Sequence, residues 1–427
     1  MRLTASSLDL RSEQFNLLIA KWSSTVTMPT NSPETIYTSR IQTWLKHIHA
    51  LAKDIGPRGP TTDGERQGHI YCQQTLDRLG HHSQWERFRA ARSIFTPHLI
   101  ASLAMLAAFV IYPLAGRTSA LVAALIAALS LASELLELSF ISNPIRWMVP
   151  KGESQNVFAV QEPSGEHKQD LILIGHVDSK RTPLIFKSTG WLSAYQTFTT
   201  VAFAAFAVMV ALYTLGIFTQ WSWILPVSAV SALCAVLLAA LCIQADLTPF
   251  TDGANDNATA VGLVLTLAEH LQAEPLAHTR VWLVNTGCED VQHYGAINFL
   301  DWHLNEFKNP HALVFEMLGC SGPGWLVKEG IIIPFKATLK LVELAEKTNA
   351  AHPELDGYPV SISGGNTEMA DALRRGIPTL TLFGMTRENI APYWHQVGDT
   401  VDKIDPAALE RNYAFTWHFL RALDEAA

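Results

Sequence analysis

The sequence has little charge, few cysteines and no long basic run. Charged residues make up 16% of the 427 positions, whereas soluble domains carry about 25%. The hydrophobic fraction of 48% excludes an intrinsically disordered chain, which is poor in apolar residues. Because the net charge is −8 and no cluster of Lys or Arg stands out, a nucleic-acid-binding protein is also excluded. The five cysteines form no CxxC pair, which predicts free thiols in a reducing compartment.

The N-terminal residues lack the basic start, apolar core and small-residue cleavage site of a secretory signal peptide, so we expect none. Residues 1–33 are polar apart from one short apolar patch. We expect them to form a separate, flexible N-terminal segment.

What the sequence does have is two nearly charge-free stretches. The second contains residues 198–218 and 223–243, each 21 residues without a charge. Since about 20 apolar residues span a bilayer as a helix, this stretch predicts a transmembrane hairpin. The first contains residues 99–115 and 120–133, and its second arm is short and meets Glu134. It predicts either a second spanning hairpin or a buried or interfacial helical pair.

A hairpin returns its two ends to the same side of a membrane, so the remaining sequence is expected on one side. Eight basic residues lie in that remaining sequence near the hairpins, namely Arg87, Arg89, Arg92, Arg146, Lys151, Lys180, Arg181 and Lys187. The turns inside the hairpins contain only Arg117. By the positive-inside rule, this asymmetry predicts a multi-pass protein of the cell membrane with its soluble part in the cytoplasm.

The rest of the chain alternates short β-rich runs with helical patterns. The runs expected as strands are residues 156–162, 171–174, 281–285, 312–315 and 379–383. This alternation predicts an α/β fold, with a mostly parallel mixed sheet sandwiched by helices. We expect one catalytic domain built from residues 34–97, 140–190 and 245–427. Residues 98–139 and 191–244 would be inserted helical hairpins.

Possible metal ligands stand after the predicted strands and, for Asp256, in a loop before a predicted helix. They are His176, Asp178, Asp256, Glu289, Asp290, Glu316 and His395. Taken singly, each has a simpler interpretation: a hydrogen-bonded structural histidine, a solvated acidic turn, or a helix N-cap. Taken together, two imidazoles and several carboxylates suit zinc or another divalent first-row metal. The set is too large for one tetrahedral ion and fits two ions bridged by a carboxylate.

The order of these motifs resembles that of the family-28 metallopeptidases of clan MH. The motifs are GHVDS at residues 175–179, GANDNA at 253–258, the acidic pair at 289–290, Glu316, and YWH at 393–395 followed by DT at 399–400. IGPR at residues 55–58 and GIP at 376–378 are also similar to family segments. The resemblance covers the soluble part from about residue 42 onward, and both hairpins are additions to it. That family includes zinc aminopeptidases, glutamate carboxypeptidases and glutaminyl cyclases.

The resemblance implies a zinc-exopeptidase-like fold and two divalent ions, expected to be zinc. It implies that His176, Asp256 and Glu316 hold one ion, while Asp256, Asp290 and His395 hold the other. It also implies that Glu289 is the general base, and that Asp178 accepts the second ring N–H of His176. Two positions depart from the usual pattern, because Asp290 is commonly Glu and Glu316 is commonly Asp. The segment GGNTE at residues 364–368 also lacks the usual acidic residues and fits a helix entry.

The function expected is therefore a membrane-anchored di-zinc aminopeptidase that hydrolyses peptides by metal-activated water. The alternatives are a glutaminyl cyclase-type zinc acyltransferase, another amide hydrolase, or a non-catalytic membrane receptor or scaffold. The expected partners are a peptide substrate and the lipid bilayer, with no nucleic acid.

The second hairpin is inserted close to the expected site. Only 18 residues separate Ser179 from Phe198, and 12 separate Ile243 from Asp256. Because an extended residue spans at most about 3.6 Å, we expect the catalytic mouth to lie near the bilayer surface. It would then accept hydrophobic peptides. Simple anchoring or assembly into a homo-oligomer is the alternative role of the hairpins.

Overall fold

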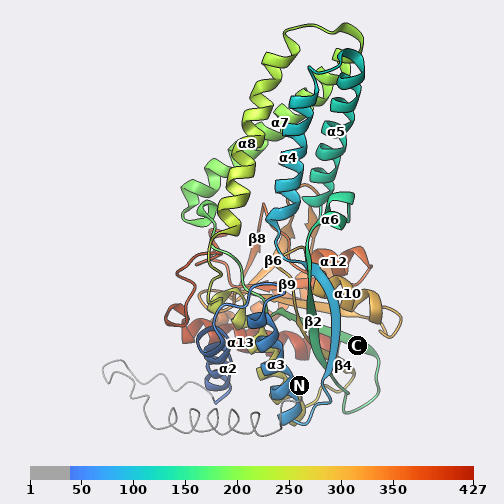
Figure 1. Ribbon diagram of the computed structural model, residues 1–427. Coiled ribbons are helices and arrows are strands. Elements are labelled where there is room, and N and C mark those ends of the chain that lie inside the picture. Colours follow the sequence, from blue (N-terminus) through green and yellow to red (C-terminus); the bar gives the residue numbers. More distant parts are fainter. Residues whose placement is uncertain (1–38) are drawn as a thin grey trace, which may run out of the picture. The chain divides into compact units, whose positions relative to one another are not determined.

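The computed structural model describes residues 39–427. These residues are coloured along the sequence in Figure 1. The N-terminal segment expected at residues 1–33 lies outside the described residues. The division into one catalytic domain and two inserted hairpins stays an interpretation of the sequence.

A nine-stranded mixed sheet forms the centre of the α/β part, in the order β1-β2-β4-β3-β5-β9-β6-β7, with β8 paired to β6. The strands are β1 (Gln84–Ala91), β2 (Lys151–Gln161), β3 (Gln169–His176), β4 (Thr279–Thr286), β5 (His311–Glu316), β6 (Gly324–Glu329), β7 (Phe335–Lys336), β8 (Tyr358–Ser361) and β9 (Thr379–Phe383). The four neighbouring strands β4, β3, β5 and β9 are parallel. Antiparallel pairs join β1 to β2, β2 to β4, β9 to β6 and β6 to β7.

The parallel centre arises from continuous apolar runs. All eight residues of β3 and all five of β9 are buried, as expected for strands covered on both faces. Strand β1, at an edge of the sheet, was not predicted, because its sequence QWERFRAA mixes charged and apolar residues and its first four residues are exposed or half-buried. The predicted fold class, an α/β protein with a mixed sheet flanked by helices, is confirmed.

The α-helices of the α/β part are α2 (Ser39–His49), α3 (Asp63–Arg78), α6 (Pro144–Met148), α9 (Thr259–Ala273), α10 (Tyr294–His303), α11 (Leu339–Ala351), α12 (Met369–Arg374) and α13 (Pro406–Glu425). Of these, α3, α9, α10, α11 and α12 contact the strands of the sheet directly. Helix α9 packs against β3 and β4, and α2 and α3 pack against α9. The indole N–H of Trp44 on α2 donates to the carbonyl of Thr259 at the start of α9, at 2.7 Å. This contact fixes the beginning of α9, directly after the loop that carries Asp256.

Four apolar helices extend from one side of the α/β part (Figure 1). They are α4 (Phe95–Ile111), α5 (Gly116–Glu137), α7 (Thr189–Thr219) and α8 (Ile224–Asp246). Each packs against two of the others, in the cyclic order α4, α5, α7, α8. By length and composition, α5, α7 and α8 are long and apolar enough to cross a membrane. The 17-residue helix α4 is shorter.

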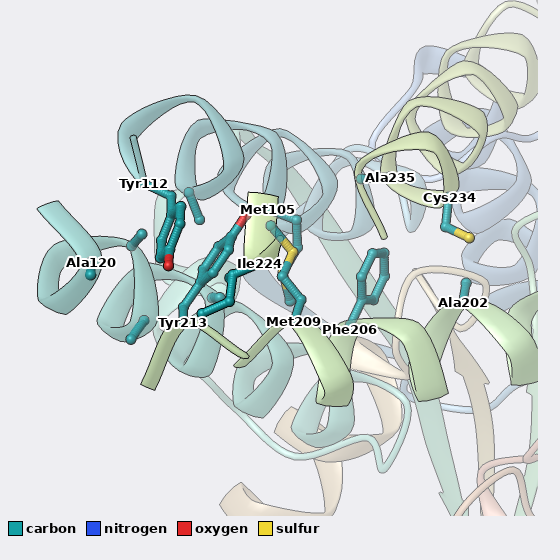
Figure 2. Close-up of a cluster of buried hydrophobic side chains, with 14 residues drawn as sticks. Met105, Tyr112, Ala120, Ala202, Phe206, Met209, Tyr213, Ile224, Cys234 and Ala235 are labelled. Carbon is teal, nitrogen blue, oxygen red and sulfur yellow. The ribbon is translucent and has the colours of Figure 1, made fainter. Parts of the chain in front are cut away.

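The core of this four-helix bundle combines close backbone packing with stacked aromatic rings. Tyr112, directly after α4, stacks on Tyr213 of α7, with ring centroids 4.4 Å apart, as Figure 2 shows. The hydroxyl of Ser231 on α8 donates to the carbonyl of Ala205 on α7 at 2.7 Å. Small residues and interhelical hydrogen bonds are typical of helices that associate in lipid. Many outward-facing residues, such as Val201 and Leu237, are apolar and exposed.

Candidate metal centre

The carboxyl ends of the parallel strands place the candidate residues together. Strand β3 ends at His176, β5 ends at Glu316, and β4 leads into the turn that carries Glu289 and Asp290. Sites of open α/β sheets lie at this edge. Asp256 arrives from the loop before α9, and His395 arrives from the loop after β9.

Both predicted imidazoles face the predicted carboxylates. His176 Nε2 lies 3.6 Å from Asp256 Oδ1, 3.6 Å from Glu316 Oε2 and 3.9 Å from Glu289 Oε2. His395 Nε2 lies 3.4 Å from Asp256 Oδ2 and 3.9 Å from Asp290 Oδ1. Asp256 therefore lies between the two histidines, at the position where the sequence argument places a bridging ligand.

Two groups within this cluster have ligand atoms that all lie within 4.8 Å of one another. They are His176 with Glu289 and Glu316, and His176 with Asp178 and Asp290. Neither group is one of the two ligand sets taken from the resemblance. The structure thus brings all seven predicted residues to one place, and the division of ligands between ions stays a prediction.

Several buried acidic oxygens at this place accept no hydrogen bond from the described residues. They are Asp256 Oδ2, Asp290 Oδ2 and Glu316 Oε1. A buried carboxylate oxygen without a partner is energetically unfavourable. Oxygens of this kind beside imidazole nitrogens form a donor set suited to zinc. The residues present therefore fit a divalent cation.

The electrostatics of the cluster support the same conclusion. Burial, followed by the charge of Asp290, raises the pKa of Asp256 well above its ordinary value. Burial also raises the pKa of Asp290 to about 7, although the nearby ammonium of Lys180 opposes this shift. Burial raises the pKa of Glu316 as well, against the opposing charge of His176. A bound cation would favour the ionised form of each carboxylate and reverse these shifts.

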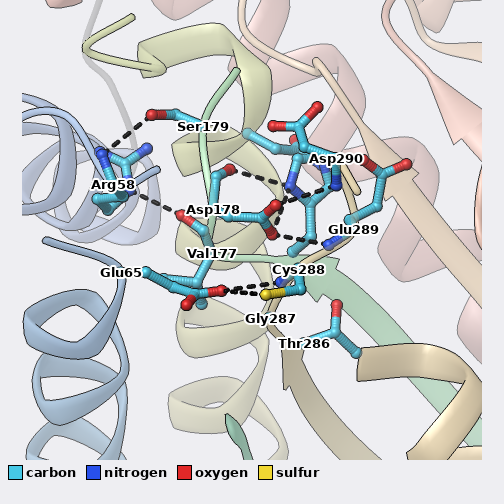
Figure 3. Close-up of polar contacts among 12 residues, drawn as sticks. Arg58, Glu65, Val177, Asp178, Ser179, Thr286, Gly287, Cys288, Glu289 and Asp290 are labelled. Carbon is cyan, nitrogen blue, oxygen red and sulfur yellow. Dashed lines mark hydrogen bonds and ion pairs between the residues drawn. The ribbon is translucent and has the colours of Figure 1, made fainter. Parts of the chain in front are cut away.

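Asp178 contacts both His176 and the turn after β4. The Nδ1 atom of His176 lies 3.1 Å from the backbone carbonyl of Asp178 and 3.6 Å from its carboxylate. The two carboxylate oxygens accept the backbone N–H groups of Glu289 and Asp290, each at 3.0 Å. Figure 3 shows this arrangement. The side chain thus holds the turn that carries Glu289 and Asp290, while the nearest acceptor of the His176 ring is a backbone oxygen.

Two partners of this turn were missed by the sequence argument. Lys180 Nζ lies 2.9 Å from Asp290 Oδ1. His293 Nε2 lies 3.2 Å from Glu289 Oε1, and its Nδ1 atom lies 2.6 Å from Asp371 Oδ2. Lys180 directly follows the GHVDS motif, and His293 stands four residues after Glu289. Spacing alone gave no reason to prefer them over other polar residues nearby.

The IGPR motif at residues 55–58 and the DT motif at 399–400 hold the backbone around the candidate metal centre. The guanidinium of Arg58 is fully buried and donates to backbone carbonyls of Leu51, Gly56, Val177, Asp252 and Gly253. It thereby ties the strand end at Val177 to the loop before Asp256. Asp399, from the DT motif, accepts the backbone N–H groups of Asn255 and Asp256 at 2.6 and 3.0 Å. Both motifs therefore position the candidate ligands.

The fold and the site together define a protein of zinc-exopeptidase-like architecture with a candidate metal centre at the strand ends. Residues 243–420 match the model of Peptidase family M28. The resemblance drawn from the motifs is confirmed. No curated protein matches the sequence.

Solved structures of two kinds share the fold. A glutaminyl cyclase from Fimbriiglobus ruber is 14% identical, with 93% of this chain and 99% of that chain covered and a TM-score of 0.53. A glutaminyl cyclase from Tannerella forsythia is 15% identical, with 89% and 98% covered and a TM-score of 0.50. A zinc aminopeptidase from Bacillus subtilis is 12% identical, with 90% and 95% covered and a TM-score of 0.53. Because the identities are only 12–15%, these similarities show the fold alone.

Proposed function

We propose that the protein is a membrane-anchored, metal-dependent exopeptidase, and specifically a di-zinc aminopeptidase. The observation that carries this proposal is the buried cluster of two imidazoles and three carboxylates with unpartnered oxygens beside Glu289. His176, Asp256 and Glu316 would hold one ion, and Asp256, Asp290 and His395 the other. A bound divalent ion would supply Lewis acidity toward the scissile carbonyl and would lower the pKa of water.

Glu289 acts as the general base in this proposal. Its carboxylate accepts a proton from the attacking water and then delivers that proton to the departing amine. Its Oε1 atom faces His293 and its Oε2 atom faces His176, so both oxygens are oriented by neighbours. Glu289 is also the least buried acid of the cluster and lines the cavity above it, where a substrate would enter.

The second candidate function is that of a glutaminyl cyclase, in which Glu289 would transfer protons in the same way. It is supported by the glutaminyl cyclases among the structures that share the fold. Another amide hydrolase would also use this chemistry. A non-catalytic receptor or scaffold is disfavoured, because every expected ligand position and the base position hold a competent residue.

We further propose that both hairpins, α4 with α5 and α7 with α8, cross the cell membrane and that the α/β part lies in the cytoplasm. The lengths and composition of these helices and the basic residues beside the hairpins support this arrangement. A cysteine-accessibility assay on whole cells, with single cysteines in the turn at residues 220–222, would place that turn outside.

The test of the proposed activity is metal analysis of the detergent-purified protein together with a substrate panel. The panel contains aminoacyl reporters, carboxy-terminal reporters and a peptide with N-terminal glutamine. We expect two zinc ions per chain and release of N-terminal residues. Glu289→Gln should retain the metal and lower kcat by about 10²- to 10⁴-fold. One ion per chain with pyroglutamyl product would favour the cyclase, and normal turnover by Glu289→Gln would refute the role of this base.

A further inference from the structure

A cavity of about 660 Å³ joins the candidate metal centre to the interior of the helical bundle. Its floor includes His176, Glu289 and Glu316, and its walls include residues of α4, α5, α7 and α8. This volume is within the range of small-molecule sites, roughly 300–1,000 Å³. The cluster that would carry out hydrolysis thus opens into a space between the apolar helices.

The cavity is long, and the buried core of the helical bundle closes its far end. Along α7 its lining residues extend from Leu192 to Phe206, a distance of about 21 Å at 1.5 Å per residue. Met105 and Phe206, which line it, also belong to the buried core of the bundle, which is drawn in Figure 2. Since half of a bilayer core is about 15 Å thick, the length suits one alkyl chain of the size found in lipids.

The cavity wall is better suited to an alkyl chain than to a peptide. The hydroxyls of Ser130, Thr199 and Thr200 donate to backbone carbonyls of the helices, at 2.8, 3.0 and 2.8 Å. His98 and Glu134 pair with each other at 2.8 Å. The three hydroxyls therefore offer no free donors to the carbonyls of a bound peptide, and unpaired buried amides are unfavourable. An alkyl chain has no such groups to satisfy.

We propose that the substrate is an amide with a single long acyl chain, such as an N-acyl amino acid. The acyl chain lies between α4, α5, α7 and α8, and its carbonyl lies at the candidate metal centre. This inference rests on the metal-dependent amide hydrolysis of the proposed function and differs from the aminopeptidase assignment in the substrate of the same site.

The reaction is an ordinary amide hydrolysis. Water adds to the acyl carbonyl carbon, the carbon–nitrogen bond breaks, and the bonding pair leaves with nitrogen. Glu289 transfers the proton of the water to that nitrogen. The products are a long-chain carboxylate, which stays in the apolar cavity or enters lipid, and a free amino acid.

The first test locates the chain without requiring turnover. The full-length Glu289→Gln protein in lipid nanodiscs is irradiated with N-dodecanoylalanine that carries a diazirine at the chain end. We expect labelling of peptides that contain Met105, Phe206 or Leu238, all of which line the cavity. Excess N-dodecanoylalanine should suppress this labelling and N-acetylalanine should not. Labelling confined to outward-facing residues such as Val201, which is 55% exposed, would overturn the inference.

The second test measures chain-length preference with a matched pair of variants. N-acylalanines with 2 to 16 acyl carbons are hydrolysed by the zinc-loaded protein in nanodiscs. Each added methylene should raise kcat/KM about fourfold until the cavity is filled. Leu238→Trp fills the cavity and should lower the ratio of kcat/KM for the 12-carbon and 2-carbon substrates by at least tenfold. Leu237→Trp places the same ring on the outer face, where Leu237 is 45% exposed, and should leave that ratio unchanged.

The outcomes separate this inference from the proposed function. Specific labelling without hydrolysis of any amide would retain the acyl-chain site and refute the hydrolase. Hydrolysis of aminoacyl reporters with no chain-length dependence and no cavity labelling would retain the hydrolase and refute the acyl-chain site. Rates that rise with the length of an apolar peptide, and not with acyl length, would replace the acyl chain by a peptide.

Discussion

Replacing Asp178 by asparagine should weaken metal binding more than it weakens folding. Asp178 is fully buried, and its two oxygens accept the N–H groups of Glu289 and Asp290 at 3.0 Å. Asparagine has almost the same shape, but it has only one acceptor oxygen and its amide group would face an N–H donor. Asp178→Asn therefore removes one charge-assisted hydrogen bond and weakens the other.

A hydrogen bond to a charged group contributes about 1.5–3 kcal/mol, and losing partners that orient metal ligands lowers metal affinity about 10- to 100-fold. We expect the Kd for zinc to rise by this factor in Asp178→Asn, because the turn that places Asp290 and Glu289 is no longer fixed. At subsaturating zinc, the rate of substrate hydrolysis by Asp178→Asn should fall by at least the same factor. The measurement is competition for zinc with a chromophoric chelator, alongside thermal unfolding of the metal-free protein.

Asp170 provides a matched control on the same strand. It is also a fully buried acid, but it lies at the opposite end of β3 and binds Arg280 at 2.5 and 3.0 Å. Asp170→Asn should lower the Tm of the metal-free protein and leave the Kd for zinc unchanged. If both variants lower the Tm equally and neither changes zinc affinity, Asp178 has a structural role only, and the positioning argument fails.

Two further substitutions test the base and the bundle. His293→Gln removes the ring whose Nε2 atom lies 3.2 Å from the Glu289 carboxylate. We expect kcat to fall about 10- to 100-fold, which corresponds to the loss of a hydrogen bond to a charged group. If elemental analysis shows full metal content and kcat is unchanged, His293 does not position Glu289. Gly216→Ala would place a Cβ atom 2.2 Å from the hydroxyl of Tyr112 and should destabilise the bundle by about 1–3 kcal/mol, measured as a lower Tm in detergent. Gly190→Ala is the control, because its nearest neighbour lies 3.8 Å away, and an equal effect of both variants would refute the packing argument.

The central strands and the convergence of the candidate ligands could be predicted from the sequence because both depend on local patterns. Runs such as residues 171–174 are apolar throughout, and a buried parallel strand requires this composition. His176 and Glu316 each end such a strand, and parallel strands bring their carboxyl ends to one edge. Chain order and topology were therefore enough to expect these side chains near one another.

The partners of the site could not be predicted, because they depend on side-chain direction within a turn. Nothing in the spacing shows that the Asp178 carboxylate, besides lying near the His176 ring, accepts the backbone N–H groups of residues 289 and 290. Nor does it show that His293 reaches back to Glu289 while bound to Asp371, 78 residues later in the sequence. The cavity was beyond prediction for the same reason, since it requires four helices to pack in a particular order.

Segments that connect the helical bundle to the α/β part contact the turn that carries Glu289 and Asp290 and the residues just after it, so the position of the bundle affects the geometry of the candidate metal centre. Arg146, after α5, pairs with Glu137 at 3.0 Å and donates to Gln292 at 2.8 Å, three residues beyond Glu289. On the other side Lys180, which precedes α7, binds Asp290 at 2.9 Å. Because Glu316 is fixed on the central strand β5, a shift of the bundle would move Glu289 and Asp290 relative to it. Deleting the bundle would therefore disturb the chemistry as well as the substrate site, and single substitutions on the cavity wall separate the two effects more cleanly.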